Sequence, residues 1–206
     1  MRSSSRLLLT LVLSLLAPAL GAQTDPRIRA GVQGGVNFAT WGGDDADGID
    51  TRTGFLIGGF AEYRLSHYFS LRPELAYSQQ GFEAEVAGID FILKQDFIQI
   101  PLLVKASASI EGQPKLRPVA YAGPTVSFEV GCQVKVSGGG VPTQEDDCPD
   151  DLVKGTDFGV MFGAGLEYDR ISLTGRYLLG LTSVDDTGSD ADVKTRVLAI
   201  LAGFRF

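Results

Sequence analysis

The side chains with the most reactive chemistry are scarce in this chain. Its 206 residues include two cysteines, Cys132 and Cys148, and one histidine, His67. Zinc-finger and other Cys/His ligand sets need more of these residues than the chain contains, so the composition excludes them. Histidine-dependent catalysis would have to use His67, which lies in a predicted short turn, and it gains little support. A net charge of −7 also argues against a nucleic-acid partner, because it repels phosphates. We therefore predict no enzyme, no catalytic residues and no cofactor.

The two cysteines form a candidate pair within one segment, residues 131–154. Fifteen residues separate them, and in an oxidising compartment an even pair at this spacing favours a disulfide. Closing a loop of that size stabilises a fold by about 3 kcal/mol on the chain-entropy estimate. The alternative is two free thiols, which an alkylating reagent would modify in the native protein. We predict the disulfide Cys132–Cys148, holding its segment as a compact lobe.

Carboxylates gather in four predicted loops, residues 41–52, 81–90, 131–154 and 184–192, which together hold 16 of the 25 acidic residues. Oxygen clusters of this kind suit Ca²⁺ or Mg²⁺. The first loop nevertheless departs from a calcium-binding pattern, since Ile49 and Leu56 occupy two of the ligand positions. A solvated acidic surface is the favoured alternative, with bound divalent cations kept as a hypothesis. The densest groups are Asp44, Asp45, Asp47 and Asp50; Glu145, Asp146, Asp147, Asp150 and Asp151; and Asp185, Asp186, Asp190 and Asp192.

The first 22 residues have the features of an export signal. Arg2 and Arg6 precede a short apolar run, and small residues follow it at 19–22, the pattern of a secretory signal peptide. The run is too short for a spanning helix of about 20 residues, so an uncleaved anchor is the weaker alternative. Cleavage would leave one domain, residues 23–206, with 25 acidic against 16 basic residues, a net charge of −9.

Alternation with a period of two runs through the rest of the chain and predicts strands. Residues 157–169 show it best, with Phe158, Val160 and Phe162 beginning one apolar face. The predicted strands are 12 to 16 residues long, which exceeds the five or six of an ordinary globular strand. Tilted strands that cross a bilayer need about 9–11 residues. The eight strands are residues 29–40, 53–65, 67–80, 91–106, 116–130, 155–169, 170–183 and 193–206.

The connections between these strands roughly alternate in length. Short turns are expected near Ser66 and at Asp169–Arg170, with the long acidic loops at the other ends. Short periplasmic turns and long outer loops are typical of outer-membrane barrels, and an even strand count puts both termini in the periplasm. We predict an all-β fold: an eight-stranded antiparallel up-and-down transmembrane β-barrel in the bacterial outer membrane, as a monomer. A soluble lipocalin-like carrier of a small ligand is the alternative.

The polar faces of the strands would then line the lumen. Eight strands leave room only for side chains inside, so these charges must pair with one another and an open pore is disfavoured. Apolar residues on the nominal lumen face at Val197, Ala199 and Leu201 indicate a partly apolar lumen or a register slip, and residues 91–96 raise the same question. The predicted lumen charge network is Glu62, Arg64, Arg72, Glu74, Lys105, Arg117, Glu129, Asp157, Glu167, Arg176 and Arg205.

The C-terminal strand ends in an apolar stripe that includes Phe204 and the last residue, Phe206. This is similar to the terminal signal that the barrel assembly machinery reads in bacterial outer-membrane barrels. A final strand that simply ends in phenylalanine is the alternative. We expect assembly machinery, membrane lipid and lipopolysaccharide as the partners of this chain.

Several segments together resemble the PorT-like outer-membrane β-barrel family common in Bacteroidetes-type bacteria. The most specific is Phe97–Lys105, with its Ile-Pro-Leu-Leu centre; the others are 73–77, 79–81, 117–124 and 162–167. The resemblance implies an eight-stranded integral barrel. It implies no single activity, although the founding type is linked to protein secretion. We predict a non-enzymatic barrel with a structural, adhesive or ion-binding role; a secretion-accessory barrel is the alternative.

Overall fold

The fold is known from a computed structural model, which describes residues 27–42, 49–86, 88–138, 141–148, 155–182 and 194–206. The predicted signal peptide, residues 1–22, lies outside the described residues. So do most of the predicted acidic clusters, which fall within residues 43–48, 149–154 and 183–193.

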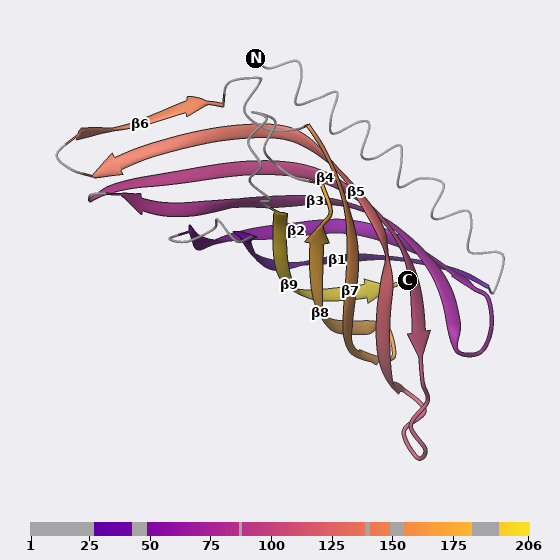
Figure 1. Cartoon of the computed structure of the whole chain (residues 1–206). Coiled ribbons are helices and arrows are strands. Elements are labelled where there is room, and N and C mark those ends of the chain that lie inside the picture. Colours follow the sequence, from indigo (N-terminus) through magenta and orange to yellow (C-terminus); the bar gives the residue numbers. More distant parts are fainter. Residues whose placement is uncertain (1–26, 43–48, 87, 139–140, 149–154, 183–193) are drawn as a thin grey trace.

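The described part of the chain forms nine strands, in agreement with the alternating pattern of its sequence (Figure 1). Each of the eight predicted strands is present, and one further short strand, β6, was not predicted. The strands are β1 (Ile28–Gly42), β2 (Ile49–Arg64), β3 (Phe69–Val86), β4 (Ile89–Ser107), β5 (Leu116–Gly138), β6 (Val141–Asp147), β7 (Thr156–Tyr168), β8 (Ile171–Gly180) and β9 (Lys194–Arg205).

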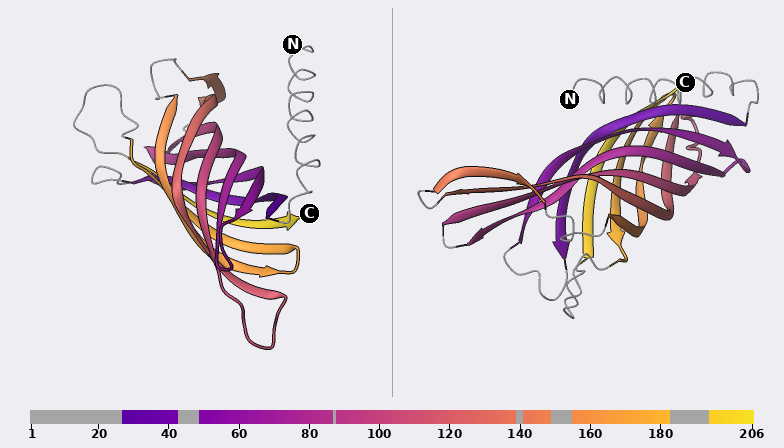
Figure 2. Two further views of the ribbon diagram at one scale, coloured as in Figure 1. Left: turned by 90° about the vertical axis from the view of Figure 1, so that its right-hand side faces the viewer. Right: turned by 90° about the horizontal axis from the view of Figure 1, so that it is seen from above.

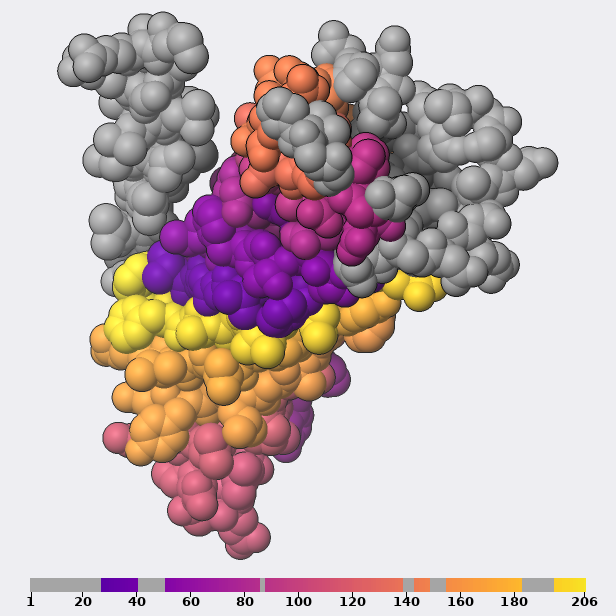
Figure 3. Space-filling model, turned by 90° about the vertical axis from the view of Figure 1, so that its left-hand side faces the viewer, coloured from indigo at the N-terminus to yellow at the C-terminus, as the bar shows by residue number. Residues whose placement is uncertain are grey.

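Eight of the described strands close into one antiparallel ring. Sequence neighbours pair with each other around it, except that β5 pairs with β7. The ring closes where β1 pairs with β9, with Gly31 opposite Arg205 and Gly42 opposite Lys194. In the space-filling view β9 accordingly lies between β1 and β8 (Figure 3). The predicted all-β, eight-stranded antiparallel barrel is confirmed.

Two of the four predicted loops are wrong, because strand pairing continues through them. Residues 81–90 belong mostly to β3 and β4, which pair up to Val86 and Ile89. The turn between them is short, and Gly88 has a φ of 79°, a left-handed conformation that glycine adopts without steric cost. Residues 131–154 contain the end of β5 and the whole of β6. Beyond a membrane both faces of a sheet meet water, so strands there need no apolar face and can be as acidic as loops.

The side chains of the ring strands alternate over most of their length between a buried inner face and a more exposed outer face. The burial pattern of β4 from Leu93 to Lys105 shows this, with odd positions buried and even positions exposed or partly exposed. The outer face is apolar: Ile57, Leu166 and Leu173 are each more than half exposed. A lipocalin-like carrier would place its apolar face inside, so that alternative is wrong.

A partly apolar lumen explains the irregular lumen face, because β4 and β9 keep their inward parity. Val197, Ala199 and Leu201 are buried inside the ring, so part of the lumen is apolar. The pairing of β4 with β5 also shifts register between Asp96 and Phe97. The shift leaves Val130 as the extra residue on β5, which is the arrangement of a β-bulge.

The two ends of the ring differ. At one end lie the short connections 65–68 and 169–170 and both ends of the described chain, where the Phe206 amide donates to the Ala30 carbonyl at 2.9 Å. At the other end β3, β4 and β5 continue past the ring, and β6 adds to the edge of β5 (Figures 1 and 2). Short turns and chain termini define the periplasmic end of such a barrel, so this four-stranded extension lies on the cell-surface side. Among the described residues, no helix is long and apolar enough to cross a bilayer.

Candidate functional site

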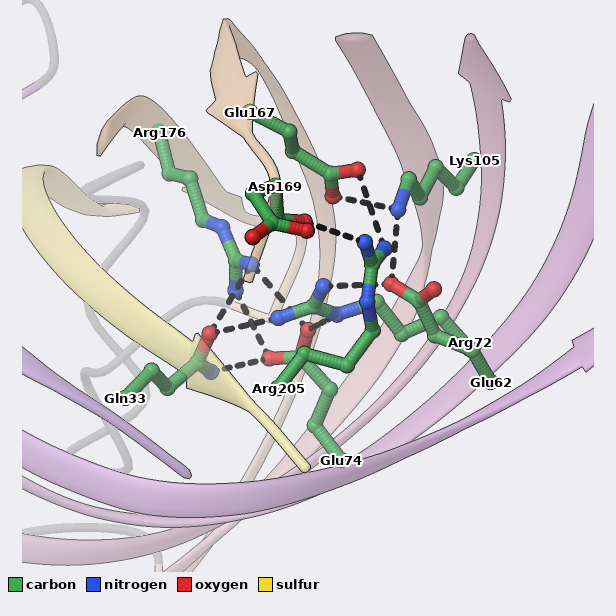
Figure 4. Close-up of polar contacts among 9 residues, drawn as sticks. All are labelled: Gln33, Glu62, Arg72, Glu74, Lys105, Glu167, Asp169, Arg176 and Arg205. Carbon is green, nitrogen blue, oxygen red and sulfur yellow. Dashed lines mark hydrogen bonds and ion pairs between the residues drawn. The ribbon is translucent and has the colours of Figure 1, made fainter. Parts of the chain in front are cut away.

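The centre of the lumen is occupied by Arg72, which is 1% exposed. Its side chain projects inward from β3 and makes three charge-assisted hydrogen bonds (Figure 4). Nε donates to Glu74 Oε1 at 2.6 Å, Nη1 to Glu62 Oε1 at 2.7 Å and Nη2 to Gln33 Oε1 at 2.8 Å. A buried cation is tolerated only when it is paired and hydrogen-bonded, and Arg72 meets both conditions.

Aromatic rings flank the same guanidinium. Arg72 Cζ lies 3.5 Å from the ring centroid of Phe60 and 5.2 Å from that of Tyr121. The Tyr121 ring also faces Arg176, whose Cζ is 4.9 Å away. Cation–π contacts of this kind strengthen when water is excluded, so the rings help to hold two cations in a narrow lumen.

Arg176, from β8, extends the ion pairing across the ring. Its Nη1 donates to Glu74 Oε2 at 2.7 Å and its Nη2 to Gln33 Oε1 at 3.1 Å. The Gln33 amide in turn donates to Glu74 Oε2 at 2.6 Å. Gly163, on the neighbouring strand, makes room for this arrangement, since a Cβ there would lie 2.8 Å from Arg176 Cγ.

Lys105, from β4, continues the chain of charges toward the periplasmic end. Its Nζ lies 2.8 Å from Glu62 Oε1 and also pairs with Glu167. Arg205 completes the series, with Nη1 3.3 Å from Glu167 Oε2. Cations and carboxylates therefore alternate without a break through the lumen. We call this set the lumen ion chain: Arg176, Glu74, Arg72, Glu62, Lys105, Glu167 and Arg205.

Four of the predicted lumen charges lie outside the lumen ion chain. Arg64 is exposed at the periplasmic mouth, and Arg117 donates to Ser107 Oγ at 2.9 Å nearby. Glu129 accepts from Gln95 at 3.0 Å higher in the barrel. Asp157 is part-buried near the opposite end, and no ion pair joins it to a cation within the described residues.

The sequence reasoning missed the uncharged members of the site. Gln33 bridges two arginines, and Phe60 and Tyr121 flank them, yet none carries a charge to mark it. A signal was available for Gln33, because it shares an odd-numbered, glycine-rich face with Asn37 on the first strand. That face is the inward one: Gln33 and Asn37 are 5% and 0% exposed.

The lumen beyond the ion chain is filled by uncharged polar and by apolar side chains. Asn37, Ser78 and Gln99 are each almost completely buried, and Asn37 Nδ2 donates to Ser78 Oγ at 2.9 Å. One cluster joins Leu103, Met161 and Leu178 with buried neighbours, and a second joins Leu56, Ala199 and Leu201. The inside of the described ring is therefore packed with side chains along its length, with the lumen ion chain toward the periplasmic end and uncharged polar and apolar groups in the rest.

The surface extension is tied by a disulfide and by an ion pair. Cys132 and Cys148 are bonded, with their Cα atoms 5.4 Å apart, which joins β5 to the end of β6. Lys94 of β4 reaches across β5 to Glu145 of β6, with Nζ 2.7 Å from Oε1. The Lys94 ammonium lowers the pKa of the Glu145 carboxyl below its usual range. The Glu145 carboxyl is therefore ionised at neutral pH, and protonation removes its charge as the pH falls through that lowered pKa.

The described acidic residues do not gather into a ligand set. Within the described ranges no group of three or more histidine, cysteine or acidic residues is placed to hold a metal ion. Glu145, Asp146 and Asp147 are all exposed on β6. His67 lies in the periplasmic turn between β2 and β3, 5.0 Å from the ring of Tyr68 in an edge-on contact.

A closed ring of eight antiparallel strands with an apolar outer face and a packed polar interior defines an integral β-barrel protein of the bacterial outer membrane. The family comparison is specific. Residues 21–186 match the family model described as the outer membrane protein beta-barrel domain, and the chain belongs to that family.

Solved structures with similar barrels come from several bacteria. The attachment invasion locus protein Ail of Yersinia pestis is 18% identical, with a TM-score of 0.44 over 86% of this chain and 98% of its own. Neisserial surface protein A is 17% identical, with a TM-score of 0.47 over 86% and 97%. OprG of Pseudomonas aeruginosa is 11% identical, with a TM-score of 0.44 over 86% and 95%. No curated protein sequence matches the chain.

Proposed function

We propose that this protein is a non-enzymatic barrel that displays an acidic binding surface on the outside of the cell. The observation that carries the proposal is the extension of β3, β4, β5 and β6 beyond the ring. A strand that only crosses the membrane needs about 9–11 residues, whereas β4 has 19 and β5 has 23. The additional length lies on the cell-surface side.

The packed lumen favours binding over transport. Charged, uncharged polar and apolar side chains fill the interior of the described ring, as expected for eight strands. The extension, by contrast, is held in one shape by a disulfide and by the Lys94–Glu145 pair. Ordering a surface before it binds lowers the entropy cost of binding.

The chemistry of the extension suits a cationic partner. Glu145, Asp146 and Asp147 follow one another along β6, and all three are exposed. We propose that this edge binds basic protein segments or divalent cations that bridge it to lipopolysaccharide. Outer-membrane lipid around the barrel, and a monomeric state in it, complete the proposal.

The test is binding to intact cells that express the barrel, with poly-L-lysine and Ca²⁺ as separate probes. An Asp146→Asn/Asp147→Asn variant, which keeps the Lys94–Glu145 pair, should lose most of the binding that wild-type cells gain over cells without the protein. Glu111→Gln is the control, because Glu111 lies in the periplasmic connection 108–115 and should bind as wild type does. Equal binding by the Asp146→Asn/Asp147→Asn variant and wild type would overturn the proposal for that probe.

A second candidate is an accessory role in protein secretion, and the Phe97–Lys105 segment supports it through its resemblance to PorT-like proteins. In this chain the segment forms part of β4, and its odd-numbered side chains face the lumen. Deletion of the gene separates the candidates. A block in the export of other proteins would favour secretion, whereas normal export with lost surface binding would favour the acidic surface.

A further inference from the structure

The periplasmic mouth of the barrel has a charge opposite to that of the chain as a whole. A cavity there is lined by six arginine and lysine side chains and one carboxylate, that of Glu62. The lining thus carries a formal surplus of five positive charges, whereas the full chain has a net charge of −7. Cationic side chains therefore gather at one opening of a protein that is acidic as a whole.

The carboxylates nearest this cavity are already paired. Glu62 is shared between Arg72 and Lys105, and Glu167 between Lys105 and Arg205. They belong to the lumen ion chain and are almost completely buried. These two carboxylates are therefore not available to neutralise the other cations of the mouth.

Three of the lining arginines, Arg29, Arg64 and Arg117, form no salt bridge with a carboxylate in the described part of the chain. Arg29 is also close enough to Arg64, Arg117 and Arg205 to be repelled by each of them. Glu62 is the carboxylate that attracts Arg29, and Arg72 and Lys105 already share it. Crowded like charges of this kind destabilise a fold unless an anion enters between them.

The geometry of the lining suits an oxyanion. Arg117 Nη2 donates to Ser107 Oγ at 2.9 Å, which directs the guanidinium along the cavity wall. Its Nε is buried and makes no hydrogen bond within the described part of the chain. The hydroxyl groups of Ser66, Ser70 and Ser107 also line the cavity. Guanidinium groups bind phosphate through paired hydrogen bonds, and hydroxyl donors complete such sites.

We propose that the periplasmic mouth binds a phosphate group through Arg29, Arg64 and Arg117. The phosphate comes either from a phospholipid headgroup of the inner leaflet or from a small soluble phosphate in the periplasm. Both sources present the same oxyanion at this end of the barrel. The site is separate from the acidic surface of β6, which lies beyond the opposite end.

The experiment uses the whole mature barrel in nanodiscs of zwitterionic lipid, titrated with inorganic phosphate in a calorimeter. A second set of nanodiscs contains phosphatidic acid, and its phosphorus resonance is followed by nuclear magnetic resonance. The test variant is Arg64→Gln/Arg117→Gln. The control is Lys115→Gln, because Lys115 is exposed at the same end but does not line the cavity.

Wild type and the Lys115→Gln control should bind alike, and the double variant should bind at least tenfold more weakly. Binding of inorganic phosphate in zwitterionic discs identifies a soluble source, and a response only with phosphatidic acid identifies the headgroup. Equal binding by the double variant, or no binding by wild type to either probe, would overturn the proposal and leave the mouth as solvated cations. A heat-dependent change in gel mobility verifies that the double variant is folded, and removal of repelling cations should preserve its stability.

Discussion

The buried charge of Arg72 is stabilised by ion pairs, by a hydrogen bond to an amide and by an aromatic ring. Two carboxylates and one amide oxygen accept its hydrogen bonds, and the Phe60 ring covers one face of its guanidinium. Each partner is itself fixed by a second contact, as Glu62 is by Lys105. Loss of one member therefore leaves several buried groups unsatisfied, which costs far more than the net value of any one pair.

Substitution of Arg72 by methionine should lower the free energy of unfolding by about 3–5 kcal/mol, the cost of leaving buried charges without a partner. The measurement is a urea titration in detergent micelles, followed by the change in gel mobility of the unheated barrel. Lys115→Gln is the control and should stay within about 0.5 kcal/mol of wild type, since it alters an exposed side chain. An Arg72→Met barrel as stable as that control would show that the lumen ion chain is not tightly coupled.

The disulfide acts on the surface extension and not on the ring. Its cysteines are 16 positions apart and both belong to the β5–β6 hairpin. Replacement of both by serine should lower the free energy needed to open the hairpin by about 3 kcal/mol, on the chain-entropy estimate. Trypsin should then cut after Lys135 on the order of a hundredfold faster, because cleavage follows the population of the open form.

Gel analysis of trypsin-treated intact cells measures that rate. The barrel of the Cys132→Ser/Cys148→Ser variant should keep its heat-dependent mobility, which separates a local effect from misfolding. Unchanged cleavage after Lys135 would mean that the β-sheet pairing of the hairpin alone holds it closed.

At the scale of the strands, the sequence predicted the ring well because a bilayer imposes a strict rule. A lipid-facing position must be apolar, so each crossing strand alternates, and the inner face follows from parity. The same rule does not act on β6, which lies outside the bilayer and has acidic residues at three successive positions. The composition of β6 resembles that of a loop, and only its pairing with β5 in the structure shows that it is a strand.

The alternation of side chains along each strand predicts which charges face inward, but it does not predict which of them contact one another. Contacts across the lumen depend on how far each strand is shifted along its neighbour, and the sequence does not state that shift. Glu74 and Arg176, 102 positions apart, meet at 2.7 Å, whereas Glu129 remains outside the lumen ion chain. The uncharged Gln33 lies between Arg72 and Arg176 for the same geometric reason.

The depth of an outward-facing residue should determine the effect of a charge placed there. Ile200 lies near the middle of β9 and faces outward, whereas Ile171 lies at the periplasmic end of β8, next to the turn. Ile200→Arg should reduce the free energy of unfolding by about 2–4 kcal/mol, and Ile171→Arg by about 0–1 kcal/mol. Urea titrations in phospholipid vesicles give both values. Equal costs would contradict the placement of the bilayer around the ring.

For the whole molecule, the filled interior predicts a barrel that does not conduct. Reconstituted in a planar bilayer, the protein should show no steady single-channel current, because side chains occupy the lumen of the described ring along its length. Insertion is checked on the same preparation by its heat-dependent change in gel mobility. A large, constant conductance from correctly inserted protein would mean that the lumen opens.

The seam between β1 and β9 has a consequence for biogenesis. It joins the first strand to be synthesised to the last, across about 170 positions at Gly31 and Arg205. Contacts so distant along the chain form late, since a long loop must close before they repay its entropy. Until β9 pairs with them, both β1 and β8 have open edges that can pair with other chains. A chain in which β9 has not yet paired is therefore prone to aggregate, and the pairing of β9 with β1 and β8 removes both open edges in one step.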